Sequence, residues 1–157
     1  MSKPKDDLVE LTTDPADYTQ PYLVYAEDNP VDYLFFERAF RNHFPDFPLS
    51  HCANGKLVRD FLVDRVESND GLPKLIVLDI KMPGLSGLEV LEFIRNTPRL
   101  SRVPVIMLSA SSEGRDIRTA YRHHVNAYVI KPERYGDLKK LIKHMGNFWI
   151  TYNYNPG

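Results

Sequence analysis

Short apolar runs alternate with longer amphipathic stretches along most of this chain. The runs have the length of β-strands, and turn-forming or charged residues bound each of them. This alternation is typical of repeated strand–helix units around a parallel sheet. The expected strands are residues 22–26, 48–52, 74–78, 104–108 and 127–130. The expected helices are residues 30–43, 56–65, 87–96, 113–124 and 134–146.

Five strands that alternate with five helices predict an α/β fold of the doubly wound class. The expected architecture is a five-stranded parallel sheet with helices on both faces and the flavodoxin-like strand order 2-1-3-4-5. A chain of 157 residues suits one domain with a real hydrophobic core. The sequence therefore predicts a single α/β domain.

The two ends of the chain differ in composition from this domain. Residues 1–20 mix Lys, Asp, Thr and Pro with little apolar periodicity, so we expect a flexible N-terminal arm. Residues 21–147 form the expected domain. Residues 148–157 are an aromatic tail, which we expect to fold back on the domain or to meet another chain, where it could support a homodimer.

Composition excludes several kinds of partner. The net charge of −1, without an excess of basic residues, predicts no nucleic-acid partner. The longest apolar runs are too short to cross a bilayer and the first residues lack a secretion signal, which predicts no membrane partner and a cytoplasmic location. Cys52 is the single cysteine, in keeping with a reducing compartment.

Polar residues follow four of the five expected strands. Glu27 and Asp28 follow the first strand, Asp79 the third, Ser109 the fourth and Lys131 the fifth. In an open parallel sheet, ligands bind beyond the carboxyl ends of the strands, where residues distant in sequence meet. The sequence therefore predicts a shared cleft with three carboxylates, one hydroxyl and one ammonium.

This set of groups is suited to a metal ion and a phosphoryl group. Three crowded carboxylates repel one another, and a bound cation would offset this repulsion. Mg²⁺ takes one or two carboxylates and several waters. We therefore expect Asp28 and Asp79 as direct ligands and Glu27 as a ligand through a water. Asp79 is central in the sheet and is the candidate nucleophile toward phosphorus. Lys131 and Ser109 are the candidates for binding phosphoryl oxygens.

Each of these residues also has a structural interpretation when it is taken alone. Glu27 and Asp28 could stabilise the dipole of the next helix, and Asp79 could be a turn residue. Ser109 could cap a helix, and Lys131 could be a solvated surface charge. The functional hypothesis depends on their joint placement at strand ends.

Three motifs carry a resemblance to a known family. Residues 79–87, Asp-Ile-Lys-Met-Pro-Gly-Leu-Ser-Gly, resemble the phosphorylation loop of the receiver domains of bacterial two-component response regulators. Ser109 followed by Ala110, and Lys131 followed by Pro132, are similar to the two remaining signatures, and the resemblance covers about residues 21–145. Residues 26–32 and 148–149 also look like single-domain regulators associated with bacterial phytochromes.

The resemblance implies specific roles at the cleft. Asp79 would be the phosphoacceptor, and Mg²⁺ would be bound by Asp28, Asp79 and the backbone carbonyl of Lys81. Tyr128 would be an aromatic switch that turns inward when Ser109 moves toward the phosphoryl group. The peptide bond between Lys131 and Pro132 would be cis.

The resemblance thus implies a phosphorylated switch. The expected function is that of a stand-alone response regulator, phosphorylated on Asp79 by a sensor histidine kinase or by a histidine phosphotransfer protein. The narrower resemblance implies a kinase of the phytochrome type. It would be no enzyme beyond slow self-dephosphorylation, which Lys81 and Ser111 would tune because they flank the entry path of water. The output would be a shift between two conformations.

Three other functions were weighed against this one. A magnesium-dependent phosphatase resembling haloacid dehalogenases needs an acid two positions after the nucleophile, where this chain has Lys81. A flavin carrier would bind phosphate at the loop after the first strand, where Glu27 and Asp28 would repel it. An interaction module that works without phosphorylation is disfavoured by the intact acid, hydroxyl and lysine set.

Overall fold

The computed structural model describes residues 10–11 and 18–156, and places their strands in one sheet with the order β1-β3-β2-β4-β5-β6. Five of these strands are parallel and reproduce the predicted order 2-1-3-4-5, whereas β1 pairs antiparallel with β3 at the edge. The strands are β1 (Glu10–Leu11), β2 (Leu23–Ala26), β3 (Leu49–Cys52), β4 (Leu75–Leu78), β5 (Val105–Ser109) and β6 (Ala127–Ile130).

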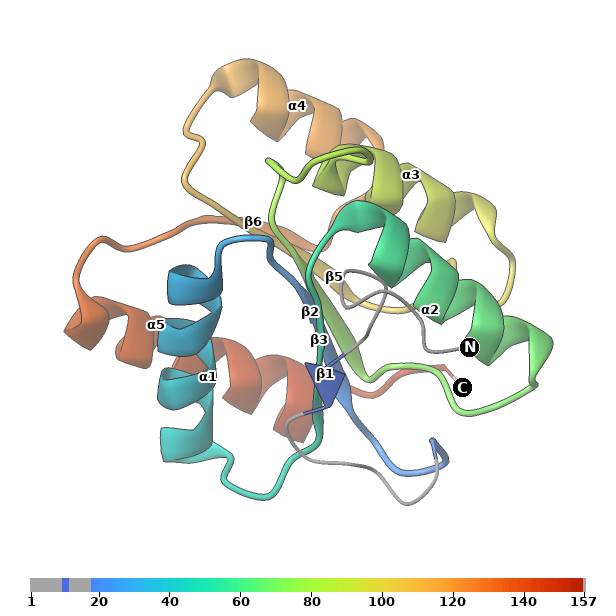
Figure 1. Cartoon of the computed structure of the whole chain (residues 1–157), viewed down its shortest axis with the longest axis horizontal. Helices are drawn as coiled ribbons and strands as arrows, with labels where there is room; N and C mark the ends of the chain where they lie inside the picture. Colours follow the sequence, from blue (N-terminus) through green and yellow to red (C-terminus); the bar gives the residue numbers. More distant parts are fainter. Residues whose placement is uncertain (1–9, 12–17, 157) are drawn as a thin grey trace, which may run out of the picture.

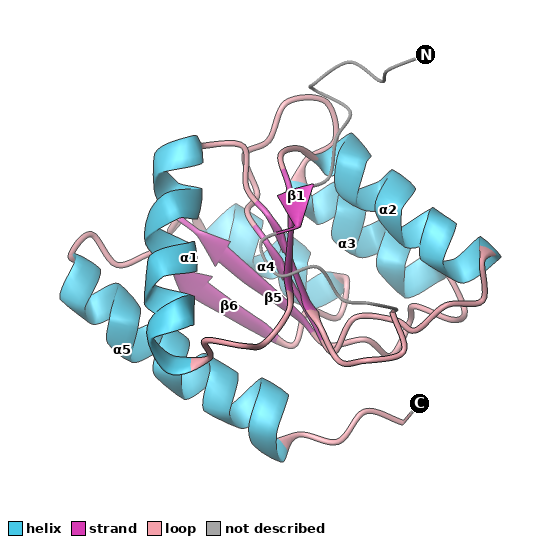
Figure 2. Ribbon diagram, turned by 60° about the horizontal axis from the view of Figure 1, so that its bottom comes forward, coloured by secondary structure: helices cyan, strands magenta, loops and turns pink. Residues whose placement is uncertain are grey.

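Helices cover both faces of the sheet, as the doubly wound prediction requires. Figures 1 and 2 show α1 and α5 together on one face, and α2, α3 and α4 on the other. The helices are α1 (Pro30–His43), α2 (Gly55–Glu67), α3 (Gly87–Asn96), α4 (Gly114–Arg122) and α5 (Tyr135–Gly146), followed by the π-helical turn η2 (Asn147–Tyr152). None of these helices is both long and apolar enough to cross a membrane.

The start of α1 is encoded by its own residues. The side chain of Asn29 accepts hydrogen bonds from the backbone N–H groups of Val31 and Asp32, at 2.9 and 3.1 Å. Pro30 occupies the first helical position, where its missing N–H costs nothing. The helix therefore begins directly after the acidic pair at the end of β2, and this fixes the position of that pair.

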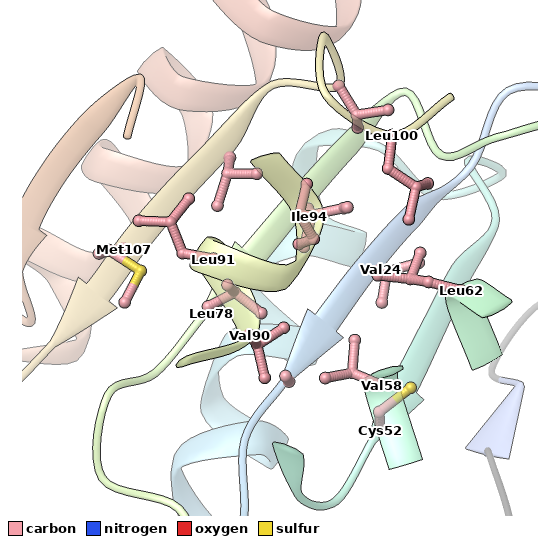
Figure 3. Packing of buried hydrophobic residues seen from close by; sticks show 14 of the residues in the cluster. Val24, Cys52, Val58, Leu62, Leu78, Val90, Leu91, Ile94, Leu100 and Met107 are labelled. Atoms are coloured by element: carbon pink, nitrogen blue, oxygen red, sulfur yellow. The ribbon is translucent and has the colours of Figure 1, made fainter. Parts of the chain in front are cut away.

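Side chains of the central strands fill two hydrophobic clusters, one on each face of the sheet. In β2, Val24 points into the cluster beneath α2 and α3, while Leu23 and Tyr25 point into the cluster beneath α1 and α5. Figure 3 shows Leu91 and Ile94 of α3 packed over the first cluster. All residues of β2 and β4 are buried, so the central strands are a rigid base for the loops at their carboxyl ends.

The two ends of the chain meet the sheet in ways that the pattern did not predict. β1 lies within the segment expected to be a flexible arm; the rest of that arm up to residue 17 lies outside the described residues. A strand of two residues is too short to show periodicity. In the tail, Trp149 and Ile150 pack on the α1–α5 side, while Tyr154 is 92% exposed, so this segment does fold back on the domain.

A substitution at Gly87 tests how closely the start of α3 approaches the end of β4. A Cβ atom at Gly87 would lie 2.0 Å from the backbone oxygen of Asp79, so an added methyl group must displace one of the two. We expect Gly87→Ala to lower the free energy of unfolding in urea by about 1–3 kcal/mol. Gly136→Ala is the control, because a Cβ there meets nothing within 4 Å. Equal unfolding midpoints for the two variants would contradict this close approach.

Candidate functional site

The predicted cleft forms where the parallel ladders end. The backbone N–H of Asp79 donates to the carbonyl of Ala26 at 3.1 Å, and that of Lys131 donates to the carbonyl of Ser109 at 2.8 Å. These bonds extend the pairing of the strands by one residue and bring the side chains to one rim. Glu27, Asp28 and Asp79 each offer a carboxylate oxygen within 4.8 Å of the others, so the three predicted acids do lie together.

Lys131 reaches across this rim and holds the carboxylates. Its Nζ lies 2.6 Å from Oε2 of Glu27, 3.1 Å from Oδ2 of Asp32 and 3.3 Å from Oδ2 of Asp79. Asp32 was not among the residues predicted for the cleft. Its position four residues after Asp28, on the first turn of α1, is the signal that could have placed it at the cleft.

Burial and charge shift the acid–base behaviour of this cluster. Burial raises the pKa of Glu27 to about 7; the hydrogen bond from Lys131 opposes this rise and the charge of Asp79 adds to it. Burial alone would lower the pKa of Lys131, but its contacts with Glu27 and the charge of Asp79 outweigh burial and raise the pKa above the ordinary value. One ammonium therefore faces an excess of carboxylates, a field that attracts a cation.

The donors of the cleft match the oxygen ligands that Mg²⁺ and Mn²⁺ prefer. Asp28 is exposed, while Asp79 is only 7% exposed at the base of the cleft. Oδ1 of Asp79 accepts the N–H of Ile80 at 2.7 Å, which fixes the orientation of the carboxylate. Direct binding of the metal by Asp28 and Asp79, with the Lys81 carbonyl as a third ligand, stays a prediction; the Lys81 side chain is exposed.

The expected switch residues are connected through the loop between β5 and α4. Ser109 is buried, and its hydroxyl accepts the backbone N–H of Ser111 at 3.2 Å. The hydroxyl of Tyr128 donates to the backbone oxygen of Ser111 at 2.8 Å, and burial raises the pKa of Tyr128. The Ser111 hydroxyl itself donates to Asp116 of α4 at 2.6 Å, so it is directed at the helix rather than at the carboxylates.

The expected cis bond between Lys131 and Pro132 is wrong. The described residues contain no cis peptide bond, so this bond is trans. The trans form of an X–Pro bond is intrinsically favoured by about 0.5–1 kcal/mol. Lys131 reaches its three carboxylates from the trans backbone, and the contacts of the site therefore do not require the cis geometry.

A doubly wound domain with an acidic cluster and a lysine at the carboxyl ends of its strands is the architecture of a receiver domain. The profile of the response regulator receiver domain family matches residues 25–143. This chain belongs to that family. The resemblance seen in the motifs is thereby confirmed, as is the fold class.

Two curated relatives match most of the chain. The probable methanogenesis regulatory protein FilR2 of Methanothrix harundinacea (strain 6Ac) is 33% identical over 138 residues, 87% of this chain and 89% of the relative. The response regulator Rcp1 of Synechocystis sp. (strain ATCC 27184 / PCC 6803 / Kazusa) is 31% identical over 129 residues, 82% of this chain and 88% of the relative. Both lengths are similar to that of this chain.

Solved structures agree with this assignment. The phosphorylated cyanobacterial phytochrome response regulator RcpA superimposes with a TM-score of 0.79 at 30% identity, covering 88% of this chain and 100% of RcpA. The Mn²⁺-bound form of Rcp1 has a TM-score of 0.77 at 28% identity, with the same coverage. Receiver domains bind a divalent metal at an acidic pocket, and the cluster of Glu27, Asp28 and Asp79 fits such a pocket.

Asp28 offers a test of the metal site. Because its carboxylate is exposed and would bind the ion directly, we expect Asp28→Asn to weaken Mg²⁺ binding roughly tenfold or more, measured by isothermal titration calorimetry. Asp137→Asn is the control, since Asp137 is an exposed aspartate in the first turn of α5. Equal Mg²⁺ affinity of the Asp28 variant and the wild type would exclude this residue as a ligand.

Proposed function

We propose that this chain is a phosphorylation-dependent switch in which Asp79 accepts a phosphoryl group in the presence of Mg²⁺. The observation that carries the proposal is the position of the Asp79 carboxylate, which lies within 4.8 Å of the carboxylates of Glu27 and Asp28 and 3.3 Å from the ammonium of Lys131. Here the negative charge of an incoming phosphoryl group would be neutralised both by the bound metal and by the ammonium of Lys131. The donor would be a phosphohistidine of a sensor kinase or of a phosphotransfer protein.

The transfer exchanges one bond to phosphorus for another. A carboxylate oxygen of Asp79 attacks phosphorus, the bond from phosphorus to the histidine nitrogen breaks, and the electron pair returns to the imidazole. A metal held by Asp28, Asp79 and the carbonyl of Lys81, with Glu27 behind a bound water, would neutralise the equatorial oxygens. Lys131 would donate to one phosphoryl oxygen and Ser109 to another.

The contacts around Tyr128 support the proposed switch. When the hydroxyl of Ser109 turns toward the phosphoryl group, it releases the N–H of Ser111, the residue whose carbonyl accepts from Tyr128. The change therefore reaches the β5–α4 loop and Tyr128 on β6. The result is a population shift that a partner reads on the face formed by α4, β6 and α5.

The names of matched structures support a particular class of donor. RcpA is described as a phytochrome response regulator, and AtBRR and RtBRR as bacteriophytochrome response regulators. AtBRR and RtBRR are 30% and 31% identical to this chain. On this basis the partner that we propose is a histidine kinase of the phytochrome type.

A phosphatase of the haloacid-dehalogenase type fits less well. That chemistry needs a second acid two positions after the nucleophile, and this position holds the exposed Lys81. Receiver domains are in general signalling switches and not enzymes. An interaction module that works without phosphate is the remaining alternative, and the next experiment separates it from the switch.

Asp79 is the decisive position. We expect wild type incubated with acetyl phosphate and Mg²⁺ to gain one phosphoryl group by intact-mass spectrometry, and Asp79→Asn to gain none. Asp64→Asn is the control, because the Asp64 side chain is 64% exposed on α2, and it should react as the wild type does. Absence of a mass gain in the wild type would favour the interaction module, and a gain in Asp79→Asn would place the phosphoryl group elsewhere.

Lys81 and Ser111 are expected to set the lifetime of the phosphoryl group. Substituting either by Ala should change the first-order decay of the purified phosphoprotein, because both flank the approach of water to Asp79, while the initial rate of phosphorylation stays the same. Arg102→Ala, at an exposed residue before β5, is the control. The same decay constant in all four proteins would refute a role for these two residues.

A further inference from the structure

The ammonium of Lys131 is fully engaged before any phosphoryl group arrives. It donates to Glu27, Asp32 and Asp79, and its closest contact, at 2.6 Å, is with Oε2 of Glu27. In the proposed function Lys131 must direct an N–H toward a phosphoryl oxygen on Asp79. An ammonium has three donors, so this turn weakens at least one of the existing contacts.

Glu27 is the carboxylate that can least tolerate the loss of a donor. Its side chain is 0% exposed, so bulk water cannot replace a hydrogen bond that Lys131 gives up. Oε1 of Glu27 accepts the backbone N–H of Asn29 at 3.1 Å. Oε2 accepts from Lys131 and from one other group, the hydroxyl of Tyr25, at 3.1 Å.

Tyr25 is placed to act as this second donor. It lies on β2, two residues before Glu27. The backbone N–H of Glu27 continues the pairing with β3 by donating to the carbonyl of Cys52 at 3.1 Å, so both side chains lie on the same face of the extended backbone. Its ring is stacked on Phe36 of α1, with ring centroids 4.0 Å apart, and is 1% exposed. The hydroxyl is therefore held in one position by packing that does not involve Lys131.

We infer that Tyr25 is a positioning residue for phosphoryl transfer, which keeps the buried Oε2 atom of Glu27 hydrogen-bonded while Lys131 turns to the phosphoryl group. The inference rests on the proposed function of Asp79. It goes beyond that function, because none of the motifs of the cleft includes a hydroxyl on β2.

This role makes a state-dependent prediction. In the free protein, Oε2 of Glu27 has Lys131 as well as Tyr25, so removal of the hydroxyl leaves it with one donor. In the phosphoryl-bearing state, the same removal leaves Oε2 of Glu27 without a side-chain donor. The penalty for the lost hydrogen bond is therefore larger in the phosphoryl-bearing state than in the free protein, where Lys131 still donates to this oxygen.

The test compares two ligands in the variant Tyr25→Phe. Mg²⁺ alone is titrated by calorimetry, and beryllofluoride, a mimic of the phosphoryl group, is then titrated at saturating Mg²⁺. Because Phe keeps the ring stacked on Phe36, we expect the thermal midpoint and the Mg²⁺ affinity to stay close to those of the wild type. We expect the affinity for beryllofluoride to fall about tenfold.

Tyr22→Phe is the matched control. Tyr22 is also fully buried and packs on the opposite face of the sheet, and its hydroxyl donates to the carbonyl of Gly71 at 2.9 Å. This variant removes the hydrogen bond of a buried tyrosine, itself partly buried, away from the cleft. Its beryllofluoride affinity should equal that of the wild type.

Each other outcome overturns the inference. Equal beryllofluoride affinity of Tyr25→Phe and wild type would show that the hydroxyl does not support the phosphoryl-bearing state. A parallel loss of Mg²⁺ affinity in Tyr25→Phe, or an equal loss of beryllofluoride affinity in Tyr22→Phe, would show a general structural effect. A wild type that binds Mg²⁺ but no beryllofluoride would overturn the proposed function, and this inference with it.

Discussion

The ion pairs of Lys131 hold together the cleft at the carboxyl ends of the parallel strands. Its ammonium contacts the carboxylates of Glu27 after β2, of Asp32 in the first turn of α1 and of Asp79 after β4, while its own backbone continues the pairing of β6 with β5. A charge cluster that is this buried is tolerable only with its pairing intact, since an unpaired buried charge is costly. The same atom that neutralises the acids is also the one that a phosphoryl oxygen would compete for, so stability and function are joined at Lys131.

The cluster remains rich in negative charge even with Lys131 in place. Burial raises the pKa of Glu27 to about 7, which reflects how poorly the cleft solvates another carboxylate charge. In the proposed function, a divalent cation would offset this excess of negative charge, and the cleft could then accommodate a phosphoryl group on Asp79. In this arrangement Tyr25 and Asn29 keep Glu27 hydrogen-bonded from the protein side, and this leaves Lys131 able to change partners.

Prediction from sequence succeeded where a pattern was local and long enough to count. The helix of residues 30–43 was predicted with the bounds that the structure has, and the starts and ends of the other main elements agree to within about two residues. It failed where the signal was short or remote: β1 is only two residues long, and the contact of Asp32 with Lys131 spans 99 positions of the chain. The cis bond before Pro132 was expected from the family resemblance, whereas the structure has the intrinsically favoured trans bond.

The sequence by itself determined the class of fold, the family and the acids, hydroxyl and lysine of the cleft, because strand periodicity and strand-end motifs are properties of neighbouring residues. Only the tertiary structure decided which oxygen each donor reaches. The contact of Lys131 with Oε2 of Glu27 spans 104 positions of the chain. The hydrogen bonds from Tyr25 to the same oxygen and from the Ser111 hydroxyl to Asp116 are short in sequence, but they depend on which way each side chain is turned by its packing. Whether such a hydrogen bond forms depends on differences of a few tenths of an ångström in the donor–acceptor distance, and no pattern of residue types encodes these differences.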